Sequence, residues 1–383
     1  MYESGCRFLV YENNESNDQL AAKYKEKLVL IKVKNIEDFI QQAGRAVANT
    51  FRCRGGKIIA ISGSNGKTTT KEMLTHILKS ALGDNAIICT QKNNNNHLGV
   101  PFTLFQIEKE SMFAIVELGS NHPGEIEHLC QMIQPNLGVT TNIGETHLEF
   151  FHNLDNVFKE ESALKDYVSE LFFVNKDDDY LKALDLLNAV EFGQEAKDFK
   201  FEFNAGVAKL NNLIVENEFI FGEHNFRNLM LSIAIAHKLL GEKIGQLITY
   251  ASEFKPTFNR SQIIDTGKQK VFLDAYNANP TSMKIAIDEF LKHCASIGAA
   301  PEDICLVIGD MNELGEQSTQ LHQDLAKYID HSKVSHVLFI GRYSDAYGSC
   351  YKGAHTCFSD VSKDKDEVKQ LIAKYKFVFI KGS

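Results

Sequence analysis

Short apolar runs alternate with segments of helical periodicity along most of this chain. Runs rich in β-branched and aromatic residues occupy 57–62, 112–117, 138–143 and 171–175, and we interpret them as buried strands. Between them, apolar positions recur at helical spacing from Met73 to Leu82 and from Ile126 to Ile133. Strands that alternate with helices predict an α/β fold with a mostly parallel sheet, whose chemistry lies at the carboxyl ends of the strands.

The second half of the chain carries two further patterns. Short segments at 201–203, 208–213 and 218–221 are typical of antiparallel strands, and a helix over 225–240 follows them. Beyond Pro256 a new alternation begins, which predicts a second doubly wound sheet. Its expected strands are 271–274, 304–309, 334–341 and 377–380, and its expected helices begin after Pro280 and cover 317–329 and 364–374.

The residues before the first buried strand form a smaller pattern of their own. Strand-like runs at 6–10 and 28–33 precede an amphipathic helix over 36–51. We therefore expect three α/β domains, which cover 1–54, 55–254 and 255–383.

Composition narrows the class of protein. The chain has 383 residues, 44% of them hydrophobic, and a net charge of -9, which argues against a nucleic-acid-binding surface. Its 8 cysteines show no metal-ligand or disulfide spacing, which fits a reducing compartment. Met1 to Asp18 lack the pattern of a secretory signal, and no apolar stretch is long enough to span a bilayer. We expect a monomeric cytoplasmic protein.

The strongest chemical signal follows the strand at 57–62. Two glycines let the backbone curl so that N–H groups and a helix N-terminus point at one anion, while a lysine and a threonine supply a charge and a Mg²⁺ ligand. A glycine-rich turn that binds no nucleotide explains the glycines but not the Lys-Thr-Thr that follows. We therefore predict a phosphate-binding loop of Gly63, Ser64, Asn65, Gly66, Lys67, Thr68 and Thr69, with a shorter glycine spacing than the common form.

Other polar residues follow the neighbouring strands. Glu117 and His147 each lie after an apolar strand, where a metal held by the phosphates would be within reach. Asn93, Asn95 and Asn96 form a polar loop whose amides suit a substrate, although by composition alone a turn that caps the next helix is the simpler interpretation.

Three later clusters also precede expected helices. They are 222–228, 274–280 and 309–315, and helix capping is a sufficient reason for any one of them taken alone. Taken together, they are typical of a site.

With these residues in view, the chain resembles the Mur ligases of peptidoglycan synthesis. The resemblance runs from the nucleotide loop to the last residue, and its most specific parts are 276–280 with Ser282 and Met283, and Gly309-Asp310-Met311-x-Glu313-Leu314-Gly315 with His322. It implies an enzyme that phosphorylates a carboxylate with ATP and lets an amine attack the acyl phosphate. These clusters point to UDP-N-acetylmuramoyl-tripeptide as the acid and D-alanyl-D-alanine as the amine.

The resemblance also implies a role for each residue. Lys67, Glu117, His147 and Arg260 would be catalytic, with Arg260, in Phe258-Asn259-Arg260, approaching the phosphates as the domains close. Thr68, Glu117, His147 and Glu161 would bind Mg²⁺. Further ATP contacts would come from His224, Asn225, Asn228, Asp274, Asn277 and Asn279, and contacts to the muramoyl-peptide from Asn93, Asn95, Asn96 and Thr141.

Two departures from the family pattern matter. Glu161 stands where the family has a lysine, carbamylated in several members, so it either replaces the carbamate as a metal ligand or pairs with Lys165 one turn on. The part before the loop is also short for the family's uridine-nucleotide domain, and the chain stops earlier than its relatives. Two alternatives therefore stay open: a catalytically impaired nucleotide-binding remnant, and a related ATP-dependent amino-acid ligase.

Overall fold

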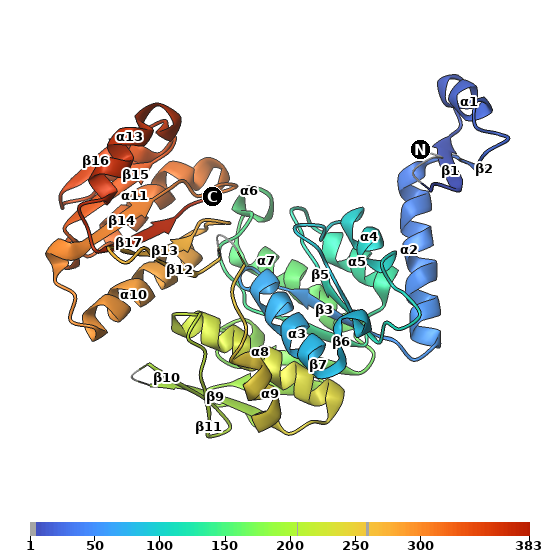
Figure 1. The fold of residues 1–383 in the computed structure, drawn as a ribbon, viewed down its shortest axis with the longest axis horizontal. Coiled ribbons are helices and arrows are strands. Elements are labelled where there is room, and N and C mark those ends of the chain that lie inside the picture. Colours follow the sequence, from blue (N-terminus) through green and yellow to red (C-terminus); the bar gives the residue numbers. More distant parts are fainter. Residues whose placement is uncertain (1–4, 205, 258–259) are drawn as a thin grey trace.

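The computed structural model describes residues 5–204, 206–257 and 260–383. Met1 to Ser4, where the expected N-terminal domain begins, and Phe258 and Asn259 of the arginine motif lie outside the described residues. Three sheets follow one another along the chain, of two, nine and six strands, and we call them the N-terminal, central and C-terminal sheets (Figure 1). The expected α/β class, with mostly parallel sheets, is confirmed.

The N-terminal sheet is a single parallel pair, β1 (Phe8–Glu12) and β2 (Val29–Val33), linked by α1 (Glu15–Ala22). Helix α2 (Ile36–Cys53) follows, and the Asn35 side chain caps it by accepting from the Asp38 N–H. Figure 1 shows β1, β2 and α1 at the far end of α2, whose other part lies beside α4 and α5 of the central sheet. Gly44 of α2 allows this approach, since a Cβ there would lie 3.0 Å from Pro101.

The central sheet has the strand order β11-β10-β9-β8-β7-β6-β3-β5-β4. Strand β3 (Lys57–Ser62) lies between β5 (Phe113–Glu117) and β6 (Leu137–Thr140) and is parallel to both. The carboxyl ends of these three strands therefore meet at one edge. The other parallel strands are β4 (Ile87–Cys89), β7 (Leu171–Asn175) and β8 (Ala189–Gly193).

Helices cover both faces of the central sheet. One face carries α3 (Lys67–Leu82), α8 (Glu223–Leu240) and α9 (Ile244–Ala251) around a core that includes Ile61, Met73 and Ile233. The other face carries α2, α4 (Gly99–Leu104) and α5 (Glu125–Ile133). At the loop edge lie α6 (Leu148–Phe151) and α7 (Leu154–Ser162).

The antiparallel part of the central sheet differs from its expected form. Strands β9 (Phe199–Asn204), β10 (Val207–Leu210) and β11 (Leu213–Val215) form it, and the expected single segment 208–213 is two strands joined at Asn211 and Asn212, both with positive φ. The expected strand at 218–221 is wrong. Its backbone turns instead because Asn217 accepts from the N–H groups of Phe219 and Ile220.

The C-terminal sheet has the order β12-β13-β17-β14-β15-β16, and the expected doubly wound pattern is confirmed. Its strands are β12 (Gln262–Asp265), β13 (Lys270–Asp274), β14 (Ile304–Ile308), β15 (His336–Ile340), β16 (His355–Phe358) and β17 (Phe377–Lys381). Strands β12 and β16, at the two edges, were not among the predicted strands. The helices are α10 (Pro280–Ser296), α11 (Ser318–Tyr328), α12 (Ser344–Gly348) and α13 (Val361–Ile372).

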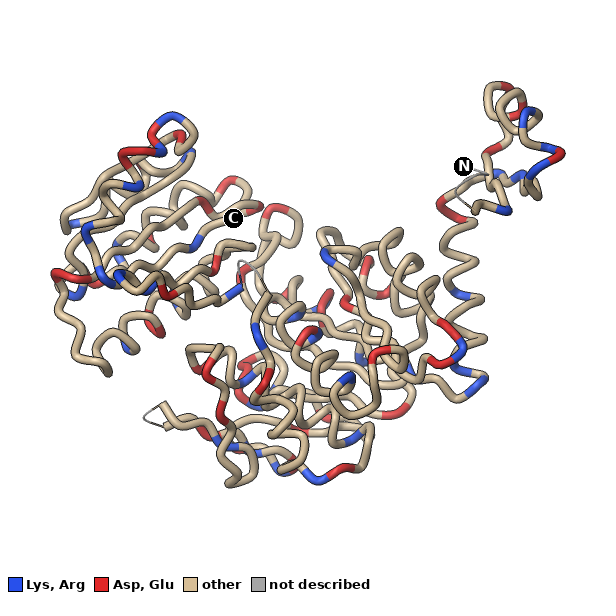
Figure 2. The backbone as a smooth tube through the Cα atoms, in the orientation of Figure 1, with Lys and Arg blue, Asp and Glu red and all other residues tan. Residues whose placement is uncertain are grey.

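Charges of both signs are distributed over all three parts of the chain (Figure 2). Among the described residues, no helix is both long enough and apolar enough to cross a membrane.

Candidate active site

The predicted phosphate-binding loop connects β3 to α3 at the centre of the sheet. Gly63 has φ of +121° and Gly66 has φ of +80°, values that side-chain-bearing residues rarely adopt. A Cβ at Gly63 would lie 2.2 Å from Oγ1 of Thr141, so this position also leaves no room for a side chain. The loop geometry therefore depends on both glycines.

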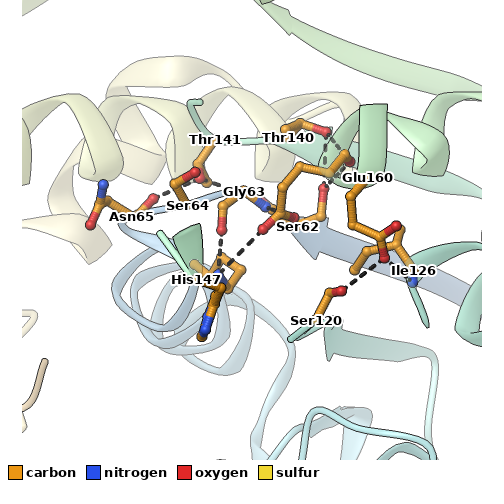
Figure 3. A network of polar contacts seen from close by, with 12 residues as sticks. Ser62, Gly63, Ser64, Asn65, Ser120, Ile126, Thr140, Thr141, His147 and Glu160 are labelled. Carbon is orange, nitrogen blue, oxygen red and sulfur yellow. Dashed lines mark hydrogen bonds and ion pairs between the residues drawn. The ribbon is translucent and has the colours of Figure 1, made fainter. Parts of the chain in front are cut away.

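Asn65, at the tip of the loop, is held from two sheets. Its backbone oxygen accepts from Oγ1 of Thr141 at 2.6 Å and from Nδ2 of Asn142 at 2.9 Å. Its side-chain Oδ1 accepts from Nδ2 of Asn279, at the start of α10, at 2.8 Å. Figure 3 shows Asn65, Ser64 and Thr141 side by side in this network. The loop thus joins the central and C-terminal parts of the chain.

The hydroxyl of Thr68 and the carboxylate of Glu117 meet at the start of α3. Thr68 Oγ1 donates to Glu117 Oε1 at 2.9 Å, and Asn95 Nδ2 donates to the same oxygen at 3.1 Å. The second oxygen of Glu117, Oε2, is buried and makes no hydrogen bond, although Nζ of Lys71 lies 3.4 Å from it. A hydroxyl beside an anionic carboxylate at a phosphate-binding loop fits a Mg²⁺ ion that also contacts phosphate oxygens.

Glu161 lies directly against the loop. Its Oε2 accepts from the Gly63 N–H at 2.7 Å, and its Oε1 lies 3.9 Å from Nζ of Lys67, which also donates to the Gly63 carbonyl. Burial raises the pKa of this carboxyl, and the nearby Lys67 charge opposes that shift. A buried carboxyl group therefore already faces the amide and the ammonium expected to bind phosphate.

The alternative pairing of Glu161 with Lys165 is wrong. Helix α7 ends at Ser162, so Lys165 lies in the following 3₁₀ turn, where its ammonium is 2.9 Å from Asp166. The neighbouring Glu160 does not contact the loop either. It accepts from the Gly124 and Ile126 N–H groups and so caps α5, and Figure 3 shows it between Ser120 and Ile126.

His147 begins α6 on the loop side of the sheet, with φ of +48°. Its Nδ1 lies 2.6 Å from Oε2 of Glu313, which belongs to the segment after β14. Despite this short distance, Nδ1 is buried without a hydrogen bond among the described residues. Sequence reasoning placed His147 near the metal but did not predict the Glu313 contact.

The three asparagines of the polar loop, Asn93, Asn95 and Asn96, make different contacts. Asn95 reaches Glu117, whereas the Asn96 side chain accepts from the Leu98 and Gly99 N–H groups and caps α4, as the simpler interpretation proposed. Asn93 contributes its carbonyl to the Asn95 N–H. A cavity of about 290 Å³ adjoins this loop, lined by residues that include Asn96, His97, Gly119 and His128.

The cluster at the start of α8 lies next to the loop. A Cβ on Gly66 would lie 2.9 Å from Oδ1 of Asn228, so these two residues are in close contact. Asn225 donates to the Phe221 carbonyl at 2.8 Å. His224 is buried, and burial lowers the pKa of its imidazole, so the ring is neutral at physiological pH.

The residues expected from the C-terminal part cluster around Lys381. Its Nζ lies 2.5 Å from Oδ2 of Asp274 and 3.0 Å from the Asn277 carbonyl. Burial alone would raise the pKa of Asp274, but the adjacent Lys381 ammonium outweighs burial. The pKa therefore lies below its ordinary value and the carboxyl remains ionised. Arg260 lies with its guanidinium 3.6 Å from the centre of the Tyr276 ring, and among the described residues it makes no hydrogen bond or ion pair with the phosphate-binding loop.

Sequence reasoning missed three polar residues near the loop: Lys71, Asn142 and Glu160. Lys71 follows Thr68 by three residues on a helix, a spacing that places both on one face, so this signal was available. The roles of Asn142 and Glu160 depend on contacts between distant segments, for which the sequence gives no local signal. Among the described residues, no group of three or more His, Cys, Asp or Glu side chains gathers as a metal site.

Comparison with known proteins agrees with this geometry. Residues 61–236 match the Mur ligase middle domain, and residues 259–383 match the Mur ligase glutamate ligase domain. The UDP-N-acetylmuramoyl-tripeptide--D-alanyl-D-alanine ligase of Rickettsia prowazekii is 30% identical over 346 residues, which cover 85% of this chain and 75% of that protein. A crystal structure of MurF from Acinetobacter baumannii has a TM-score of 0.83 at 24% identity and covers all of this chain and 89% of its own. MurF from Thermotoga maritima in complex with ADP has a TM-score of 0.80 at 20% identity.

Proposed function

The chain belongs to the Mur ligase family, and from this membership we propose that it is an ATP-dependent, ADP-forming ligase of peptidoglycan precursor synthesis. It joins D-alanyl-D-alanine to UDP-N-acetylmuramoyl-tripeptide. One observation carries the proposal: a phosphate-binding loop whose Thr68 meets Glu117 and whose Asn65 meets Asn279 of the C-terminal part.

The reaction has two steps. The substrate carboxylate attacks the γ-phosphorus of ATP and ADP leaves, which gives an acyl phosphate. The amine of the dipeptide then attacks the acyl carbon, and inorganic phosphate leaves with its electron pair while the amine loses a proton. Activation is needed because a carboxylate oxygen is a poor leaving group until it carries phosphate.

Residues of this chain position the phosphates. The N–H groups around Gly66 and the ammonium of Lys67 face the β- and γ-phosphates, and Lys67 leaves its place at the Gly63 carbonyl to do so. Thr68, Glu117 and His147, with Glu161 as a further candidate, would hold Mg²⁺, which would supply positive charge to neutralise the transferring group.

Other residues bind the rest of the nucleotide and the substrates. His224, Asn225 and Asn228 lie toward the base, while Asp274, Asn277 and Asn279 approach from the C-terminal part. Arg260 leaves the Tyr276 ring on closure to meet the phosphates, which excludes water from the acyl phosphate. The muramoyl-peptide contacts come from Asn93, Asn95, Asn96 and Thr141.

In this proposal the enzyme works in the cytoplasm. Each of the three sheets belongs to one domain. Residues 1–54 belong to the uridine-nucleotide end, 55–254 bind ATP, and 255–383 contact the amine substrate and the nucleotide. Within the described residues, the sheet of the N-terminal domain is the β1–β2 pair.

Release of ADP tests the proposal. Turnover that requires both UDP-N-acetylmuramoyl-tripeptide and D-alanyl-D-alanine supports it. ATP binding without turnover would instead indicate an impaired nucleotide-binding protein. ADP release with a free amino acid in place of the dipeptide would indicate a related ligase.

A further inference from the structure

The segment 309–315, singled out in the sequence, connects β14 to α11 and reaches across to α6. The Glu149 N–H points at the Glu313 carbonyl at 3.4 Å, and a Cβ on Gly315 would lie 3.1 Å from the Glu149 Cα. A cavity of about 820 Å³ lies between this segment and α6, lined by residues that include Leu148, Glu149, Glu313 and Arg342. The segment is therefore a contact between the C-terminal and central parts.

Within this contact, two residues meet in unusual backbone conformations. Glu313 has φ of +62° and His147 has φ of +48°, and neither is glycine. Such conformations are unfavourable for residues with a side chain and persist where the surroundings require them. Here both turns bring side chains together, with Glu313 Oε2 at 2.6 Å from His147 Nδ1.

The segment that carries Glu313 is fixed from behind. The buried His322 accepts from the Met311 N–H at 3.0 Å through Nε2, and its Nδ1 donates to the Ser318 carbonyl at 2.5 Å. The Asp310 carboxylate accepts from the N–H groups of Arg342 and Tyr343 at 2.8 and 3.0 Å. Glu313 therefore projects from a turn whose backbone is held in place by hydrogen bonds.

The two nitrogens of His147 have different surroundings. Nδ1 is buried and lies 2.6 Å from Oε2 of Glu313, although it forms no hydrogen bond in this conformation, and no contact of Nε2 with the described residues accompanies it. The charge of His147 also acts on Glu161, whose pKa is raised by burial and lowered in smaller part by Lys67 and His147. His147 therefore lies within electrostatic range of the carboxylate that contacts the phosphate-binding loop.

We propose that Glu313 is a positioning residue for the metal site. When Mg²⁺ is bound, its carboxylate accepts a hydrogen bond from the Nδ1–H of His147 and thereby turns Nε2 toward the Mg²⁺ that accompanies ATP. Histidine ligands of metals are commonly oriented in this way by a carboxylate. Because the carboxylate comes from the C-terminal part and the histidine from the central part, docking of the two parts completes the metal site. This inference rests on the proposed function.

A plain surface ion pair is the competing explanation, since half of the Glu313 side chain is exposed. Such a pair would change stability little and leave Mg²⁺ affinity unaffected. Metal affinity therefore separates the two explanations better than activity or stability does.

The test measures Mg²⁺ affinity by titration calorimetry of the ADP-bound protein. Glu313→Ala should weaken Mg²⁺ binding by about 10-fold or more, while ADP binding without Mg²⁺ stays as in the wild type. Glu313→Gln keeps an acceptor for the Nδ1 proton and should lose less. Glu316→Ala is the matched control, because Glu316 directly follows this segment and lines the same cavity.

Two outcomes would overturn the inference: equal Mg²⁺ affinity in Glu313→Ala and Glu316→Ala, or a lowered melting temperature in Glu313→Ala with unchanged Mg²⁺ affinity. Failure of the proposed function looks different. In that case the wild-type protein itself would not bind ADP and Mg²⁺ together.

Discussion

The ammonium of Lys71 lies 3.4 Å from Oε2 of Glu117, and both side chains are almost completely buried. The other oxygen of Glu117 already accepts from Thr68 and Asn95. Lys71 is therefore the cation that balances this carboxylate when no metal is bound, and it leaves one oxygen free of hydrogen bonds for a ligand.

Replacing Lys71 by methionine should destabilise the metal-free protein by about 3 kcal/mol, because the Glu117 charge stays buried without its partner. Urea denaturation measures the change. The exposed Lys57–Glu170 pair offers a control, and Lys57→Met should cost less than about 1 kcal/mol. Equal losses in the two variants would contradict a buried charge pair at Glu117.

Removal of the loop lysine should abolish turnover. Lys67 is the ammonium closest to the expected γ-phosphate position, so Lys67→Ala should lower the rate of ADP release by at least about 100-fold. The variant Lys79→Ala, on the same helix but paired with exposed Asp84, should keep the wild-type rate. A near-normal rate in Lys67→Ala would count against the assignment of the loop.

The sequence predicts the strand, turn and helix around the loop well, because the signals for them are local. A strand, two glycines and Lys-Thr lie within 57–68, and the structure has them as β3, a turn and the start of α3. Glu117 and His147 were placed by the rule that parallel strands end at one edge. The predicted strand at 218–221 is wrong for a local reason too. The Asn217 side chain accepts from the Phe219 N–H, and this hydrogen bond turns the backbone.

Contacts between distant segments were not predictable in the same way. The pairing of His147 with Glu313 spans 166 positions, and that of Asn65 with Asn279 spans 214. Such pairs depend on how two sheets dock, which no periodicity encodes. Glu161 shows the same limit, since helical spacing offered Lys165 as one of two possible partners, whereas α7 ends at Ser162 and Glu161 instead accepts from the Gly63 N–H.

The raised pKa of Glu161 predicts a pH effect on stability. Burial favours the protonated carboxyl in the folded state, so the folded pKa lies above the ordinary value of 4.5. Relative to Glu161→Gln, the wild-type free energy of unfolding should therefore be highest below that value and fall as the pH rises toward the folded pKa. Denaturation of both proteins across this range measures the difference, and a difference that is independent of pH would contradict it.

A lysine at position 161 tests whether this position must be anionic. Glu161→Lys would set a second ammonium beside Lys67 and remove the acceptor of the Gly63 N–H, so ADP release should be largely lost. Added bicarbonate supplies CO₂, which joins the neutral amine to form a carbamate and releases a proton, and this new anion should restore turnover. Glu161→Gln cannot form a carbamate, so bicarbonate should leave it inactive. Unchanged turnover of Glu161→Lys without bicarbonate would show that the loop needs no anion here, and Glu161 would then have no role as a metal ligand.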